Sequence, residues 1–233
     1  MKSVNDILSE FKLDQSTIDR LSAETRELSN ECGKKGVIKN LSSETWDLLD
    51  DISEQVWQSK DSWSVKIKLG FELFELFPSY YHFLVPFYRC LRDGELTDQQ
   101  DCNSIWQHFM HFLSRENYYS DPIGYVLWVE FFEDQSTVEK TWRGLMQFRE
   151  NRTAVRKLLE YIGPVPFEWK KTLYLELLPD KDFHEIVLTS LLYSAYDLFG
   201  SVSFTGARSI LRKLVIDRSS DNYKLLVKKL SQK

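Results

Sequence analysis

Residues 63–77 read WSVKIKLGFELFELF, and this stretch decides the fold class. Its large apolar side chains recur every three or four residues, which places Phe71, Phe74 and Phe77 on one side of a helix. Pro78 follows directly and cannot continue that helix. The spacing therefore predicts a strongly apolar α-helix that packs against other helices.

The same aromatic spacing recurs along the rest of the chain. Trp106, Phe109 and Phe112 again follow one another at three-residue intervals. Only 9 Gly and 6 Pro occur among 233 residues, too few for the frequent turns of an all-β chain. Residues 125–129 have strand-like composition but no partner strand, so we predict an all-α protein. Six residues on the apolar sides of helices are predicted to face a common interior: Phe71, Phe74, Trp106, Phe109, Trp142 and Leu145.

Capping patterns and prolines mark where the helices begin and end. Asp121 followed by Pro122 predicts one helix start, and Pro166 predicts another. Pro86 either kinks a helix over residues 80–91 or marks its first turn. These signals divide the chain into about ten helices of roughly ten to twenty residues. Three capping boxes are predicted to open helices: Thr97 with Gln100, Ser136 with Glu139, and Asp182 with Glu185.

Short polar links between these helices imply antiparallel neighbours. Successive hairpins of about forty residues match the paired helices of HEAT-type arrays in length, although the sequence shows no repeat consensus. An irregular α-helical bundle and a degenerate HEAT-like α-solenoid both fit this pattern. Because no long linker occurs, residues 1–233 are predicted to form a single all-α domain, with residues 1–40 as a peripheral helical pair.

The net charge of −5 is unevenly distributed along the chain. Residues 207–233 contain eight basic and two acidic side chains, a charge of +6, which leaves −11 for residues 1–206. An acidic body binds nucleic acid poorly, whereas a basic end can contact phosphate, RNA or an acidic protein. The two helices expected in this end, over residues 204–217 and 221–231, are predicted to turn Val215 and Val227 inward.

The polar amino-terminal sequence and the short apolar runs predict a cytoplasmic protein without membrane contact. Asp6, Glu10 and Asp14 interrupt the first residues, which therefore lack the apolar core of a signal peptide. The densest apolar stretch, residues 83–88, is far shorter than the roughly twenty residues that cross a bilayer.

Catalytic and metal-binding motifs are weak in this sequence. His108 and His111 lie three residues apart and could share one metal ion, but no second ligand pair has matching spacing. The sequence contains no GxSxG elbow, no P-loop and no GxGxxG fingerprint. We therefore predict no metal, no cofactor and no catalytic residue.

Basic rows and tyrosine pairs are the candidate binding sites. Basic side chains at helical spacing suit phosphate or an acidic partner, and a solvated helix face is the alternative interpretation. Tyrosines at helix ends suit protein contacts, and core packing is their alternative. The candidates are the inner basic row Arg149, Arg152 and Arg156, the terminal residues Arg212, Lys213 and Lys228, and the pairs Tyr80, Tyr81 and Tyr118, Tyr119.

These observations predict a non-catalytic protein that binds another macromolecule, foremost another protein. Helical hairpin stacks suit adaptors, inhibitors and toxin-neutralising immunity proteins. One alternative is an enzyme or ligand-binding protein with an aromatic-walled cavity containing His82, His108 or His111. Another is nucleic-acid binding through the basic carboxy-terminal helices.

Overall fold

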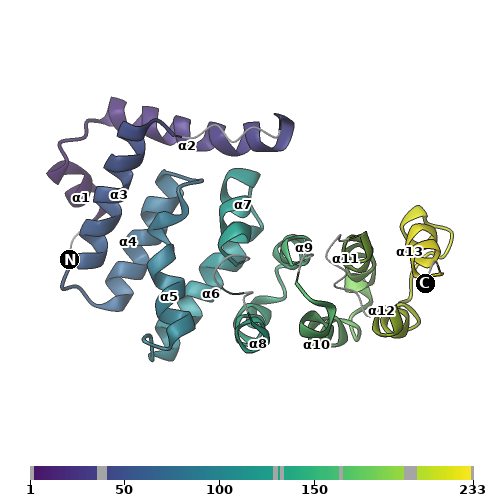
Figure 1. The fold of residues 1–233 in the computed structure, drawn as a ribbon. Coiled ribbons are helices and arrows are strands. Elements are labelled where there is room, and N and C mark those ends of the chain that lie inside the picture. Colours follow the sequence, from purple (N-terminus) through teal and green to yellow (C-terminus); the bar gives the residue numbers. More distant parts are fainter. Residues whose placement is uncertain are drawn as a thin grey trace. The chain divides into compact units, whose positions relative to one another are not determined.

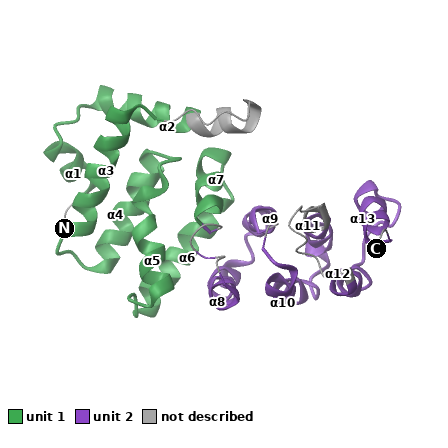
Figure 2. Ribbon diagram, in the orientation of Figure 1, with its two compact units in different colours: residues 1–126 green, residues 127–233 purple. Residues whose placement is uncertain are grey.

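A computed structural model describes residues 3–35, 41–127, 131, 134–162, 165–196 and 204–231 (Figure 1). Within these ranges the regular elements are thirteen α-helices and three short 3-10 helices, which confirms the all-α prediction. The chain divides into two compact units, Met1–Val126 and Leu127–Lys233 (Figure 2). The single domain predicted over residues 1–233 stays a prediction.

Unit 1 is built around a row of helices in which α3 packs on α4, α4 on α6 and α6 on α7. The first two helices pack on this row, α1 on α4 and α2 on α7. Residues 36–40 of the predicted amino-terminal pair lie outside the described residues. The elements of unit 1 are α1 (Val4–Glu10), α2 (Gln15–Lys35), α3 (Ser43–Gln58), α4 (Trp63–Leu76), η1 (Tyr81–Phe83), α5 (Val85–Asp93), α6 (Gln99–Leu113) and α7 (Asn117–Val126).

The stretch that predicted the fold becomes α4, whose aromatic side chains form the centre of unit 1. The Phe71 ring lies 5.9 Å from the Phe109 ring, and the Phe74 ring meets the Phe112 ring edge-on at 5.1 Å. Gly70 permits this packing, because a Cβ atom there would lie 2.5 Å from the Phe87 ring. Aromatic pairs in these arrangements stabilise a core beyond the area they bury.

Unit 2 consists of two rows of helices (Figure 1). In one row α8 packs on α10 and α10 on α12, and in the other α9 packs on α11 and α11 on α13. Stacked helical hairpins have this order, but for the chain as a whole the choice between bundle and solenoid stays a prediction. The elements are α8 (Gln135–Leu145), η3 (Met146–Phe148), α9 (Arg152–Tyr161), α10 (Phe167–Leu177), η4 (Lys181–Phe183), α11 (His184–Tyr196), α12 (Phe204–Leu211) and α13 (Asp221–Ser231).

The six residues predicted to be interior are all buried. Four of them belong to unit 1, whereas Trp142 and Leu145 lie on α8 in unit 2. Burial of each side chain therefore follows from its place on the apolar side of its helix.

Neighbouring aspartates, rather than the predicted capping boxes, begin three helices. Asp98 accepts hydrogen bonds from the backbone N–H groups of Gln100 and Asp101 at the start of α6, where Thr97 was expected. Asp134 caps α8 in place of Ser136, and Asp180 caps η4 in place of Asp182. A carboxylate accepts the free N–H groups as a hydroxyl does and also carries the charge that a helix start favours.

Two of the prolines begin helices, and one does not. Pro86 lies in the first turn of α5, and Pro166 is the residue before α10. Pro122, by contrast, lies inside α7, so the predicted start at Asp121 is wrong. Pro122 cannot donate to the Tyr118 carbonyl four residues earlier, and the Ser79 hydroxyl donates to that carbonyl instead, at 3.2 Å.

Candidate functional site

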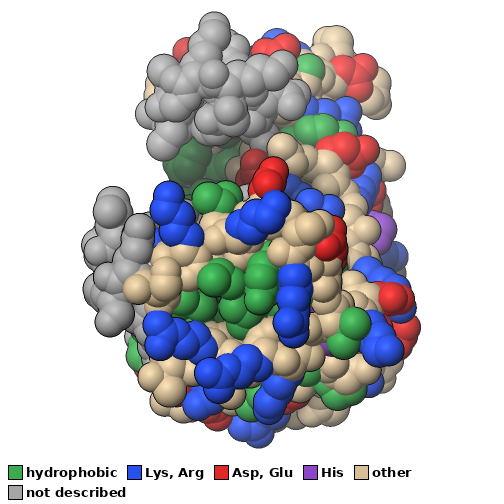
Figure 3. Space-filling view, turned by 90° about the vertical axis from the view of Figure 1, so that its right-hand side faces the viewer, with side chains coloured by type: hydrophobic (Ala, Val, Ile, Leu, Met, Phe, Trp, Pro, Cys, Tyr) green, Lys and Arg blue, Asp and Glu red, His purple; other side chains and the backbone are tan. Residues whose placement is uncertain are grey.

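The end of unit 2 formed by α12, α13 and the segment between them combines exposed apolar and basic side chains. Figure 3 looks onto this end and shows apolar side chains at its centre with Lys and Arg around them. Val215 is 63% exposed, Leu225 43% and Val227 38%. We call these three residues, together with the exposed basic residues around them, the terminal surface. The basic residues are Arg212, Lys213, Arg218, Lys224 and Lys228.

The basic side chains of the terminal surface outnumber the acidic ones, and Asp217 interacts with one of them, Lys224, through its charge. None of the five forms an ion pair within 4 Å in the part of the chain that the structure describes. Across residues 204–231 seven basic side chains face only two acidic ones, Asp217 and Asp221. The surface is therefore positively charged and remains available to an acidic group.

Buried contacts hold the backbone of the terminal surface in place. Leu226 and Leu230 are the buried side of α13, which packs on α11. The His184 ring is buried and joins three segments, because its Nε2 donates to the Leu178 carbonyl and its Nδ1 accepts from the Val215 N–H, both at 2.8 Å. One neutral tautomer of histidine satisfies both hydrogen bonds.

The prediction that Val215 and Val227 turn inward is wrong. Helix α12 ends at Leu211, so the helical period that grouped Val215 with Ile210 and Leu214 does not extend that far. Val227 lies on α13, but the buried side of that helix is occupied by Leu226 and Leu230. The excess of basic residues indicated this region, whereas its exposed apolar centre appears only in the structure.

The inner basic row is largely neutralised. Arg152 contacts Asp182 and lies 3.6 Å from Asp180, and Arg156 lies 3.5 Å from Glu160. Arg149 is exposed and is the one member of the row without an ion pair among the described residues. The row therefore offers one unpaired cation, whereas the terminal surface offers five.

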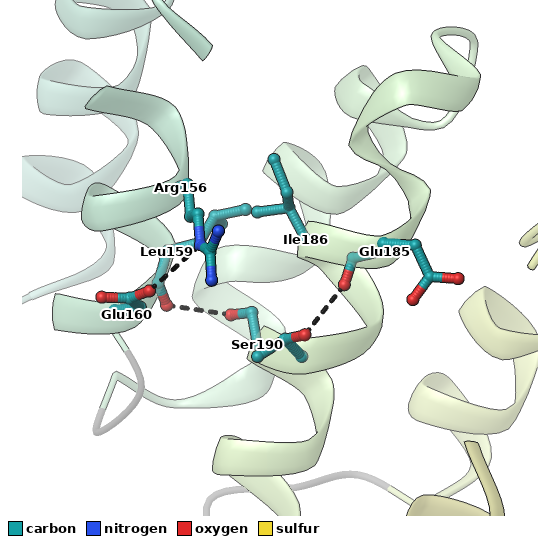
Figure 4. Close-up of a pocket in the computed structure, with 7 residues that line it drawn as sticks. Arg156, Leu159, Glu160, Glu185, Ile186 and Ser190 are labelled. Atoms are coloured by element: carbon teal, nitrogen blue, oxygen red, sulfur yellow. Dashed lines mark hydrogen bonds and ion pairs between the residues drawn. The ribbon is translucent and has the colours of Figure 1, made fainter. Parts of the chain in front are cut away.

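Arg156 and Glu160 also line a pocket between α9 and α11 (Figure 4). Its volume is about 140 Å³, and Ser190 on its wall donates to the Leu159 carbonyl at 3.0 Å. Pockets that enclose small molecules usually measure about 300–1,000 Å³ and have apolar walls. This one is smaller and has charged side chains, and none of the described residues that line it is aromatic, so it does not match the aromatic-walled cavity of the ligand-binding alternative.

Each predicted tyrosine pair contains one buried and one half-buried ring. Tyr80 is buried, and its hydroxyl donates to Asp50; burial and this carboxylate raise its pKa. The Tyr119 hydroxyl donates to the Glu75 carbonyl at 3.0 Å inside unit 1. Tyr81 and Tyr118 are half-buried, so they are the members of the pairs that retain exposed surface.

The paired histidines occupy different surroundings. His108 stacks on Phe71 at 4.2 Å, and its Nδ1 lies 2.7 Å from the Ser104 carbonyl, whereas His111 is exposed. His82, the third histidine of the ligand-binding alternative, lies 3.2 Å from an Asp50 oxygen. In the described ranges no three His, Cys, Asp or Glu side chains are grouped so that they could hold a metal ion. The absence of a metal stays a prediction.

The burial of His108 predicts a pH dependence of stability. Desolvation lowers the pKa of His108 below its ordinary value of 6.5, so the unfolded chain binds more protons than the folded one as the pH falls toward that value. We therefore expect His108→Phe to reduce the loss of stability between pH 7 and pH 5. Urea denaturation at both pH values measures this, with His111→Phe as the matched exposed control. An equal loss in wild type and His108→Phe would contradict the prediction.

Among the helices that the structure describes, none has both the length and the apolar character to cross a bilayer. Searches of protein-family models, curated proteins and solved structures give no match to this chain.

Proposed function

We propose that this is a non-catalytic binding protein whose terminal surface docks onto an acidic surface of another protein. One observation carries the proposal: exposed Val215, Leu225 and Val227 belong to the same segment, residues 212–228, as five exposed basic side chains that have no ion-pair partner in the described residues. An apolar centre with a polar rim is the usual arrangement of a protein interface. Such a surface suits an adaptor, an inhibitor or a toxin-neutralising immunity protein.

The exposed aliphatic side chains of the terminal surface support the same proposal. Helix α13 and the segment before it retain three of them. Removing apolar side chains from water is favourable, so a partner that covers these three side chains would gain binding free energy.

The apolar centre also favours protein over nucleic acid. Binding to nucleic acid rests mainly on contacts between basic side chains and phosphates. Aliphatic side chains gain little beside a phosphate, whereas they contribute when they are buried against another apolar surface. The basic side chains alone would suit either a nucleic acid or an acidic protein. The exposed valines and leucine favour the protein.

Charge reversal tests the proposal. We expect Arg212→Glu, Lys213→Glu, Lys228→Glu to weaken binding at least about tenfold, because each reversed charge would repel an acidic partner. The matched control is Lys140→Glu, Arg143→Glu, Lys181→Glu, which changes the net charge equally at exposed positions away from the terminal surface. Proteins captured from the source cell by wild type and control, but not by the reversal variant, are then purified and their dissociation constants measured.

Two outcomes would overturn the proposal. If the reversal variant binds every purified partner as wild type does, the terminal surface is not the binding site. If it instead loses salt-dependent binding to mixed RNA or DNA while protein binding is unchanged, the surface recognises phosphate. Circular dichroism of all three proteins checks that their helical content is the same.

A further inference from the structure

Helix α3 carries an unpaired acidic surface that is the counterpart of the terminal surface. Its exposed carboxylates recur every three to four residues and thus lie along one side of the helix, and α3 contains no Lys or Arg. We call this row the acidic stripe. Its members are Glu44, Asp47, Asp51 and Glu54.

The acidic stripe has no basic partner within the described part of the chain. None of its four carboxylates forms an ion pair there, whereas Asp50, on another side of α3, contacts Tyr80 and His82. Like charges at three- and four-residue spacing repel one another and destabilise a helix. A basic surface placed against the stripe would relieve this repulsion.

The acidic stripe also borders an apolar side chain. Asp51 and Glu54 line a shallow hollow together with Glu10 and the half-buried Phe11. None of the described residues that line this hollow is basic. Acidic groups beside an apolar side chain are complementary in charge to the terminal surface, which combines exposed basic and apolar side chains (Figure 3).

We propose that the acidic partner of the terminal surface is the acidic stripe of a second copy of this chain. The inference rests on the proposed function, since it names the occupant of the same surface. In a pair, one copy contributes its terminal surface and the other contributes its acidic stripe. The first copy therefore keeps a free stripe, and the second keeps a free terminal surface. Contacts of this kind extend into chains or close into rings.

A charge-swap experiment tests the head-to-tail contact. The stripe variant is Asp47→Lys, Asp51→Lys, Glu54→Lys, and the terminal variant is Arg212→Glu, Lys213→Glu, Lys228→Glu. Sedimentation velocity measures the average mass of each protein and of their equimolar mixture over a hundredfold range of concentration. The measurements are made at about 0.01 M and about 1 M salt, where exposed charges act over about 30 Å and about 3 Å.

The expected result is specific to complementary charge. At low salt the average mass of wild type rises with protein concentration, and high salt suppresses this rise. Each triple variant associates more than about tenfold more weakly than wild type. Mixing the two variants restores association, because the unchanged terminal surface of the stripe variant meets the unchanged stripe of the terminal variant. The two reversed surfaces also match each other in charge. The control Lys140→Glu, Arg143→Glu, Lys181→Glu associates as wild type does.

Wild type that stays monomeric throughout, or a mixture that fails to restore association, would overturn the inference. If a triple variant loses helical content, the experiment is repeated with the single reversals Asp51→Lys and Lys228→Glu. Each of these should weaken association, and their mixture should restore it. Failure here is distinguishable from failure of the proposed function. A terminal variant that loses a purified acidic partner while wild type stays monomeric leaves the proposed function standing and rejects self-association.

Discussion

Replacing Phe74 by alanine is expected to lower the free energy of unfolding by about 3–5 kcal/mol, the usual cost of truncating a buried aromatic side chain. Phe74 is fully buried in α4, and its ring contacts the rings of Phe112 at 5.1 Å and Tyr119 at 6.0 Å. Truncation removes both contacts and leaves a cavity that the surrounding helices fill only partly. Urea denaturation followed by far-UV circular dichroism measures the loss.

Tyr125→Ala is the control for Phe74→Ala. Tyr125 is also an aromatic residue of unit 1, but 45% of its surface is exposed. Its truncation should cost less than about 1 kcal/mol, since exposed side chains contribute little to stability. A melting temperature of Phe74→Ala equal to that of wild type would show that the aromatic cluster around α4 does not stabilise unit 1.

Replacing His184 by phenylalanine is expected to destabilise unit 2 by about 2–4 kcal/mol, because two buried hydrogen bonds lose their partner at once. The substitution keeps a ring of similar size but removes the donor to the Leu178 carbonyl and the acceptor for the Val215 N–H. Hydrogen exchange should show faster exchange at the Val215 amide and over residues 207–231. This region includes the terminal surface, so binding should weaken together with stability.

The same substitution at an exposed histidine separates these hydrogen bonds from a general effect of phenylalanine. His111 is exposed on α6, and His111→Phe should change stability by no more than about 0.5 kcal/mol. Equal stability of His184→Phe and wild type, with unchanged exchange at Val215, would show that the His184 bridge does not hold the terminal segment.

The existence of most helices was predictable, whereas their ends were not, and the errors in three helix starts share a physical cause. Capping boxes at Thr97 and Ser136 looked sufficient, but nearby aspartates provide the caps. At Asp134, hydrogen bonds from Thr137 lower the pKa of the carboxyl, so it is charged where the helix start favours negative charge. Several residues near a helix start can cap it, and the choice depends on how the chain enters the helix.

Candidate binding residues were harder to predict than helices, because sequence spacing does not show pairing across space. Arg152 follows Arg149 on the helical period, yet its charge is balanced by Asp180 and Asp182, some thirty residues away. Tyr80 resembled a contact residue and is buried beside Asp50. Pairing and burial of this kind depend on long-range contacts, which local periodicity does not contain.

The spacing of apolar residues is enough to predict an all-α protein and the buried side of most helices. Both follow from local physics: aromatic residues such as Phe71 and Phe74 recur at the helical period, and few glycines or prolines interrupt them. Which charges remain unpaired and which apolar residues stay exposed depends on contacts between distant parts of the chain. Val215 is exposed because α12 ends before it, and the five basic residues of the terminal surface form no ion pair within 4 Å in the described chain, since only two acidic residues accompany them in residues 204–231.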